Sequence, residues 1–158
     1  MRWALIFVLG CSGTPSGEGA GGPNTVSGKI QGVSFDHVAS AYWIGMPSAA
    51  PPAAFVFLLE SPTTCAAIST ANWDKIIGDE QVLEIEIRDP AVKTLAVPAQ
   101  AAAAYLRREY NPSAEAGTVT LSRIDAGKSM SGSFEALFAG EKLAGTFEAT
   151  WCASGVEP

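Results

Sequence analysis

The stretch GSFEALFAGEKLAGTFEATWC, residues 132–152, decides the fold class because it contains one seven-residue pattern twice. The copies cover residues 132–138 and 145–151. In each copy Phe, Ala and a final aromatic residue alternate with Glu and with Leu or Thr. The Phe, the Ala and the final aromatic residue therefore share one face of a strand. We expect Ala139–Lys142 to form the turn between the copies. The stretch therefore predicts a β-hairpin with an apolar inner face.

A two-residue period recurs along much of the chain before this hairpin, which is typical of half-buried strands. The segments concerned are 26–32, 38–44, 82–87, 92–97 and 118–122. In 82–87 Leu83, Ile85 and Ile87 share one face, and Glu84 and Glu86 are expected on the solvated face of an edge strand. Residues 54–59 form a continuous apolar run, which predicts a central strand buried on both faces.

Two segments are candidates for a helix. Residues 65–76 are expected to form a short helix around Trp73. Residues 100–110 are rich in alanine, which favours a helix, but the alternation of Ala101, Ala103 and Tyr105 and the β neighbours favour a strand. Seven to nine short strands then predict an all-β domain, an antiparallel β-sandwich or a small barrel, with or without one short helix.

The N-terminus has the features of a secretory signal. Arg2 precedes an apolar run over residues 3–9, and a Gly/Ser/Pro-rich segment follows from Ser12 to Pro23. The run is too short to cross a bilayer as a helix. A buried strand or helix of the domain is the alternative, but such a glycine-rich link to a packed element is unusual.

The residues Val8, Leu9, Gly10 and Cys11 resemble the lipobox of bacterial lipoproteins. The resemblance implies that Cys11 is the lipid attachment site and the new N-terminus. It also implies an envelope location, with the outer membrane favoured because Ser12 is not the Asp linked to inner-membrane retention. The expected domains are 1–10, the signal peptide, 11–25, the lipidated Cys and flexible linker, and 26–158, the β-sandwich domain.

The number of cysteines agrees with this interpretation. The chain has three, and an odd number in a secreted protein leaves one thiol to explain. If Cys11 is lipidated, Cys65 and Cys152 remain for one disulfide in an oxidising compartment. The alternative is that both are buried free thiols.

The hairpin gives a second resemblance. Its motif G-[ST]-F-[DE]-A-x-[FW], at residues 132–138 and 145–151 before Cys152, resembles that of small bacterial lipoproteins of unknown function. The resemblance implies a related fold and no particular activity.

No group of residues predicts catalysis or metal binding. His37, the only histidine, stands beside Asp36, and such a pair can orient a general base. However, no G-x-S-x-G nucleophile motif is present. An acidic cluster lacks the spacing of a calcium loop, and we expect it to be solvated. Its members are Asp79, Glu80, Glu84, Glu86 and Asp89.

Two further groups have simple structural interpretations. Glu135 and Glu148 are expected close together on the outer face of the hairpin, where paired carboxylates could in principle cleave glycosides. The basic and aromatic patch is too small for nucleic acid, and the net charge of −6 opposes such a partner. The members of this patch are Tyr105, Arg107, Arg108 and Tyr110.

We therefore expect an anchored, non-enzymatic module without cofactor or metal, held at the membrane by its lipid and binding an envelope protein partner. The alternative is a periplasmic small-ligand carrier, and a hydrolase using His37 is the third hypothesis. A carrier would have a pocket between the sheets lined by Trp43, Phe55, Phe57 and Trp151. A contiguous cavity would favour the carrier, and a filled core with an exposed apolar patch would favour the protein-binding module.

Overall fold

The structure is a computed structural model that describes residues 24–46, 49–68, 80–106 and 111–153. In these ranges the regular structure is β-strand apart from one 3-10 turn, η1, at Cys65–Ala67. The strands are β1 (Thr25–Ile30), β2 (Val33–Ser34), β3 (Ser40–Met46), β4 (Ala53–Leu59), β5 (Val82–Arg88), β6 (Thr94–Val97), β7 (Ala101–Leu106), β8 (Ala116–Asp125), β9 (Ser129–Phe138) and β10 (Glu141–Trp151). The predicted all-β fold class is confirmed.

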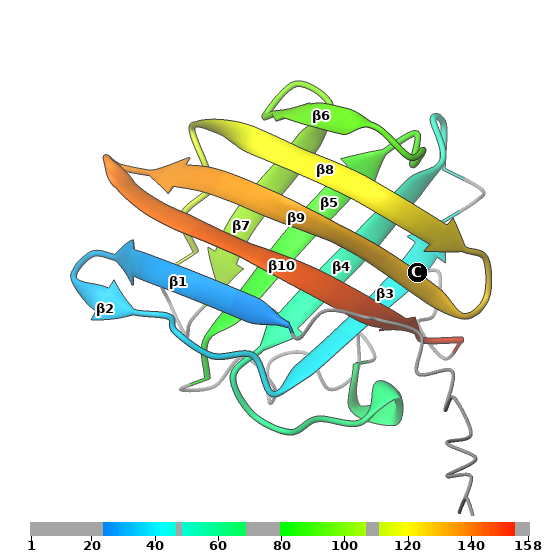
Figure 1. Cartoon of the computed structure of the whole chain (residues 1–158), viewed down its shortest axis with the longest axis horizontal. Coiled ribbons are helices and arrows are strands. Elements are labelled where there is room, and N and C mark those ends of the chain that lie inside the picture. Colours follow the sequence, from blue (N-terminus) through cyan, green and yellow to red (C-terminus); the bar gives the residue numbers. More distant parts are fainter. Residues whose placement is uncertain (1–23, 47–48, 69–79, 107–110, 154–158) are drawn as a thin grey trace, which may run out of the picture.

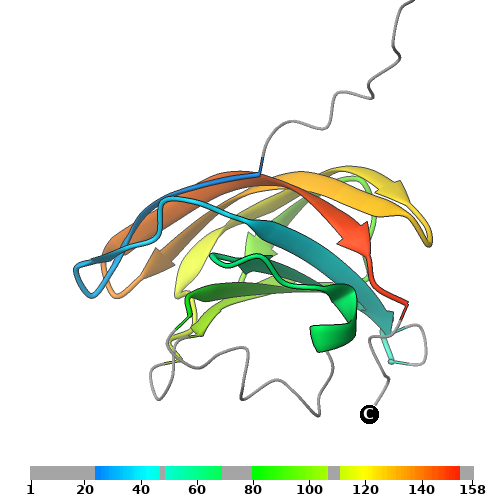
Figure 2. The ribbon, with the colours of Figure 1, turned by 90° about the horizontal axis from the view of Figure 1, so that it is seen from below.

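The strands form one sheet that folds over into two layers. Its order is β6-β8-β9-β10-β3-β4-β5-β7, with β1 added to β10 and β2 to β1. In Figure 1 the front layer of β1, β10, β9, β8 and β6 crosses the back layer of β3, β4, β5 and β7. Figure 2 shows the two layers edge-on, one curved over the other. The architecture is a nearly closed, flattened barrel.

Strand β10 joins the layers because its one edge has two different neighbours. Near its start it pairs with β1, from Thr25 opposite Thr146 to Gly28 opposite Leu143. Near its end it pairs with β3, and this contact is parallel, with Trp151 opposite Trp43. The other described pairs in the sheet are antiparallel. The parallel contact is a feature that the strand patterns did not predict.

The two ends of the sheet, β6 and β7, leave few backbone groups for another strand. Gln100, between them, donates its backbone N–H to the carbonyl of Ala96 at 2.8 Å. Along the outer edge of β7, Tyr105 donates to the carbonyl of Pro112 at 3.0 Å, and Ala114 donates to that of Ala103 at 2.7 Å. Exposed strand edges can pair with strands of other chains. Here the edge of β6 is short, and the edge of β7 is covered.

The C-terminal hairpin forms as predicted but with a tighter turn. β9 ends at Phe138 and β10 begins at Glu141, which pairs with Phe138. Only Ala139 and Gly140 lie between them, and both have positive φ, 48° and 84°. Two-residue turns of this conformation match the right-handed twist of the strands. The predicted four-residue turn, 139–142, was therefore two residues too long.

The register of the hairpin explains why its pattern repeats. Gly132 pairs with Phe147, and Gly145 pairs with Phe134, so each phenylalanine lies opposite the glycine of the other copy. A Cβ at Gly132 would lie 2.8 Å from the ring of Phe147, and one at Gly145 would lie 3.0 Å from that of Phe134. The missing side chains thus make room for the two buried rings, an arrangement in which aromatic residues cover sheet glycines.

Side chains from both layers fill the main core. Val56, Ile85 and Ile87 of the back layer face Leu121, Phe134 and Phe147 of the front layer, and all are at most 4% exposed. A second cluster lies on the opposite, outer face of the back layer, where Leu59, Val82 and Leu106 pack under Ile68. Strand β4 therefore buries side chains on both faces, as its continuous apolar run predicted.

The other predictions for local structure have mixed outcomes. Residues 101–106 form strand β7, as favoured, and residues 107–110 lie outside the described ranges. Only η1 represents the helix expected at 65–76, since 69–76 lie outside the description. β5 is not an edge strand, because it pairs with β4 on one side and β7 on the other. The described part of the chain has ten strands where seven to nine were expected.

Candidate functional site

The predicted disulfide between Cys65 and Cys152 is present, with the two Cα atoms 5.5 Å apart. It joins η1 to the residue that follows β10. Cys152 is 1% exposed, and its N–H donates to the carbonyl of Trp43 at 2.9 Å. The alternative of two free thiols was wrong. The bond fixes η1 beside the outer face of the back layer.

The four aromatic residues predicted to line one pocket lie on opposite faces of the back layer. Trp43 and Trp151 belong to the inner side, with ring centroids 4.4 Å apart. Phe55 and Phe57 belong to the outer side, where their rings stack with centroids 6.5 Å apart. The predicted pocket does not form with this lining, because successive residues of a strand point to opposite faces and Trp43 pairs with Val56.

The outer side of the back layer presents a surface that the sequence analysis missed. We call it the outer apolar face, and its members lie in two neighbouring cross-strand rows. One row contains Tyr42, Phe57, Glu84 and Ala104, and the other contains Ile44, Phe55, Glu86 and Ala102. All except the buried Phe57 are partly exposed. The apolar run at 54–59 was the available signal, because a strand buried on both faces requires apolar neighbours on each face.

Glu84 and Glu86 occupy the centre of this face and not a solvated edge. Glu86 accepts a hydrogen bond from Nε of Arg88 at 3.0 Å. Among the described residues nothing donates to the carboxylate of Glu84 or pairs with it. Burial raises the pKa of the Glu84 carboxyl, and the neighbouring charge of Glu86 raises it further. The solvated-face interpretation was therefore wrong for Glu84.

The other predicted acidic residues disperse. Glu80 accepts the backbone N–H of Ser61 at 2.8 Å, and Asp89 pairs with Lys93 at 3.6 Å. Asp79 lies outside the described residues. In the described ranges no group of three or more His, Cys, Asp or Glu side chains could hold a metal ion.

Glu135 and Glu148 are not neighbours, contrary to the prediction. Glu135 pairs with Ala144, and Glu148 pairs with Ser131, so they lie four residues apart along the sheet, roughly 13 Å. Glu135 forms an ion pair with Lys142, and Glu148 forms one with Arg123 at 3.1 Å. This separation gives them no shared glycosidase geometry.

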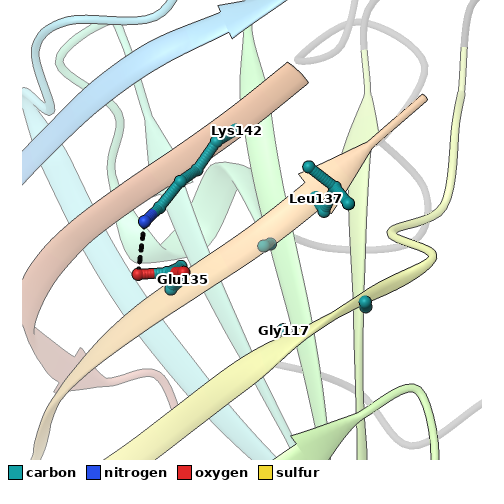
Figure 3. Close-up of a pocket in the computed structure, with 6 residues that line it drawn as sticks. Gly117, Glu135, Leu137 and Lys142 are labelled. Carbon is teal, nitrogen blue, oxygen red and sulfur yellow. Dashed lines mark ion pairs between the residues drawn. The ribbon is translucent and has the colours of Figure 1, made fainter. Parts of the chain in front are cut away.

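A small hollow of about 170 Å³ lies beside the Glu135–Lys142 pair on the outside of the front layer. Figure 3 shows the ion pair, with Leu137 of β9 and Gly117 of β8 at the side. The two charged side chains are 57% and 53% exposed, so solvent screens them strongly. The described residues that line the hollow present no unpaired charge or nucleophile to a ligand.

His37 and Asp36 form an exposed pair before β3, with Nδ1 of His37 3.3 Å from Oδ1 of Asp36. No hydroxyl is hydrogen-bonded to this ring within the described residues. A general base needs a partner that holds it and a nucleophile that it activates. Only the first of these two is present in the described structure.

Tyr105 is not part of a surface patch, because its side chain is 1% exposed and lies in the core. Its hydroxyl donates to Oε1 of the buried Gln81 at 2.6 Å, and Gln81 in turn donates to Glu60 at 3.2 Å. Alternation placed Tyr105 on an inward face, but its hydrogen-bond partner Gln81 lies directly before β5, so the pattern of β7 did not predict it.

Several predicted residues lie outside the described ranges. They are Cys11, Trp73, Arg107, Arg108 and Tyr110.

Comparisons with protein-family models, with curated proteins and with solved structures found no match. In the described part of the chain, no helix has the length and apolar character needed to span a membrane.

Proposed function

We propose that this protein is a lipid-anchored lipoprotein of the cell envelope whose barrel is a non-enzymatic module for binding a protein partner. The Cys65–Cys152 disulfide is the observation that carries the proposal. Such bonds persist mainly in oxidising compartments such as the periplasm and the cell exterior. Since this bond uses two of the three cysteines, Cys11 is the one left for the lipid that its lipobox-like context implies.

The outer apolar face supports the protein-binding role. Buried side chains of both layers pack against one another between the layers, and Tyr42, Ile44 and Phe55 remain partly exposed on the other side of the back layer. Contiguous apolar surface of this kind is typical of interaction sites. The short edge of β6 and the covered edge of β7 offer little to an added strand at these two ends of the sheet, which favours docking on this face.

A small-ligand carrier is the second candidate, and one atom favours it. Nε1 of Trp43 is buried and has no hydrogen-bond partner among the residues that the structure describes. Buried polar groups usually have a partner, because an unpaired donor costs roughly 1 to 3 kcal/mol. A ligand or a water that accepts this hydrogen bond would remove the cost.

The anchor is tested with Cys11→Ala. We expect the wild-type protein to incorporate labelled palmitate and to sediment with membranes, and the variant to be unlabelled and released. One acyl chain gives only marginal binding, so release should be large when all chains are lost. Unlabelled wild-type protein in the cytosol, with Cys65 open to alkylation, would refute the proposal.

A further inference from the structure

The centre of the outer apolar face combines aromatic rings with carboxylates. Across the strands, Phe57 pairs with Glu84, and Phe55 pairs with Glu86. On the far side the carboxylates have only Ala104 and Ala102 as cross-strand neighbours. Each acidic side chain therefore lies between a large aromatic side chain on β4 and a small alanine side chain on β7.

The charge of this arrangement is not balanced. Arg88 is bonded to Glu86, and the carboxylate of Glu84 has no ion-pair or hydrogen-bond partner among the described residues. Tyr42 is the other titratable group in its row, and η1 brings no charged residue to the face. A carboxylate that is partly desolvated and unpaired is unfavourable unless a cation reaches it.

We propose that this face binds a partner segment in which a lysine or arginine side chain is flanked by apolar residues. The cation lies at Glu84 and Glu86, where the aromatic rings also favour positive charge. The apolar flanks cover Phe55 and Ile44. This inference rests on the proposed protein-binding function and adds the chemistry of the partner. Opposite charge would set the register of the complex as well as its affinity.

A pair of capped five-residue peptides tests the recognition chemistry. One has a central lysine between leucine and valine residues, and the other has norleucine in place of the lysine. In NMR titrations of the isotope-labelled protein, we expect the lysine peptide to shift the amide signals of Phe55, Glu84 and Glu86. The norleucine peptide should bind about tenfold more weakly.

Glu84→Gln and Glu115→Gln provide matched variants. Both remove one negative charge, and Glu115 is exposed outside the outer apolar face. We expect Glu84→Gln to weaken lysine-peptide binding about tenfold and Glu115→Gln to leave it unchanged. Equal binding of both peptides, or of the lysine peptide to both variants, or no shift at these residues, would overturn the inference.

Photo-cross-linking in cells separates this inference from the proposed function. Phe55 is replaced by a photoreactive phenylalanine analogue, with and without Glu84→Gln. Protein adducts that Glu84→Gln abolishes support both ideas. Adducts that persist in Glu84→Gln leave the interaction function standing and overturn the role of the cation. If no adduct forms at this position, both the docking role of the face and the inference fall.

Discussion

Removing the disulfide should destabilise the barrel more than any single exposed substitution. Cys65 and Cys152 are 87 residues apart, so the bond restricts most of the unfolded domain. For a loop of this length, chain entropy contributes about 4.5 kcal/mol to the free energy of unfolding. Domains are typically stable by only 5 to 15 kcal/mol, so we expect Cys65→Ser/Cys152→Ser to lose a large part of its stability.

The assay is thermal unfolding followed by circular dichroism. All proteins carry Cys11→Ser, so that neither lipid nor a third thiol affects the comparison. For a domain of about 130 residues, a loss of 4.5 kcal/mol corresponds to a fall in Tm of roughly 15 °C. Cys11→Ser alone is the control, and adding reductant to it under unfolding conditions should reproduce the double variant.

A fall in Tm below about 4 °C would refute this reasoning. It would mean that the unfolded chain is already compact enough for the bond to remove little entropy. Local packing alone does not predict the large effect, since only Cys152 of the pair is buried in the core.

Two further variants test features of the sheet. Glu84 has a raised pKa in the folded state, so the native protein binds the proton of this carboxyl more readily than the unfolded chain does. The free energy of unfolding of the wild type should therefore fall as the pH rises from the pKa of Glu84 in the unfolded chain through its pKa in the folded protein. Glu84→Gln should therefore gain stability over the wild type across this window and keep the gain at neutral pH in urea titrations; a gain confined to low pH, or one matched by Glu115→Gln, would contradict the cause. In Gly145→Ala the new Cβ would lie 2.0 Å from the carbonyl oxygen of Thr25 and 3.0 Å from the Phe134 ring, so the backbones of β1 and β10 must move apart there. We expect a loss of about 1 to 3 kcal/mol in urea titrations, whereas the exposed Ser133→Ala should change stability by about 0.5 kcal/mol or less; equal effects would argue against the close approach of β1 to Gly145.

Local patterns were enough to predict most of the strands and the C-terminal hairpin. The side chains of a strand alternate with a period of two, so each strand can be recognised from a few adjacent residues. For the same reason the repeat at 132–138 and 145–151 showed which residues face inward. The disulfide was also predictable, because only one pairing remained once Cys11 was assigned to the lipid.

The outer apolar face could not be predicted in the same way. Its two rows join residues from β3, β4, β5 and β7. Glu84 and Glu86 alternate with aliphatic residues, and a solvent-exposed edge strand would show the same pattern. Only the position of β5 between two neighbours makes Glu84 a partly desolvated, unpaired carboxylate.

The sequence by itself therefore determined the fold class and the inward side of most strands, and it predicted the pairing of Cys65 with Cys152. The tertiary structure decided which strands are neighbours, including the parallel contact of β10 with β3 and the separation of Trp43 from Phe55. The physical reason is the distance along the chain over which each feature is determined. Alternation is set by the backbone geometry of adjacent residues, whereas strand order is set by burial summed over segments distant in the chain.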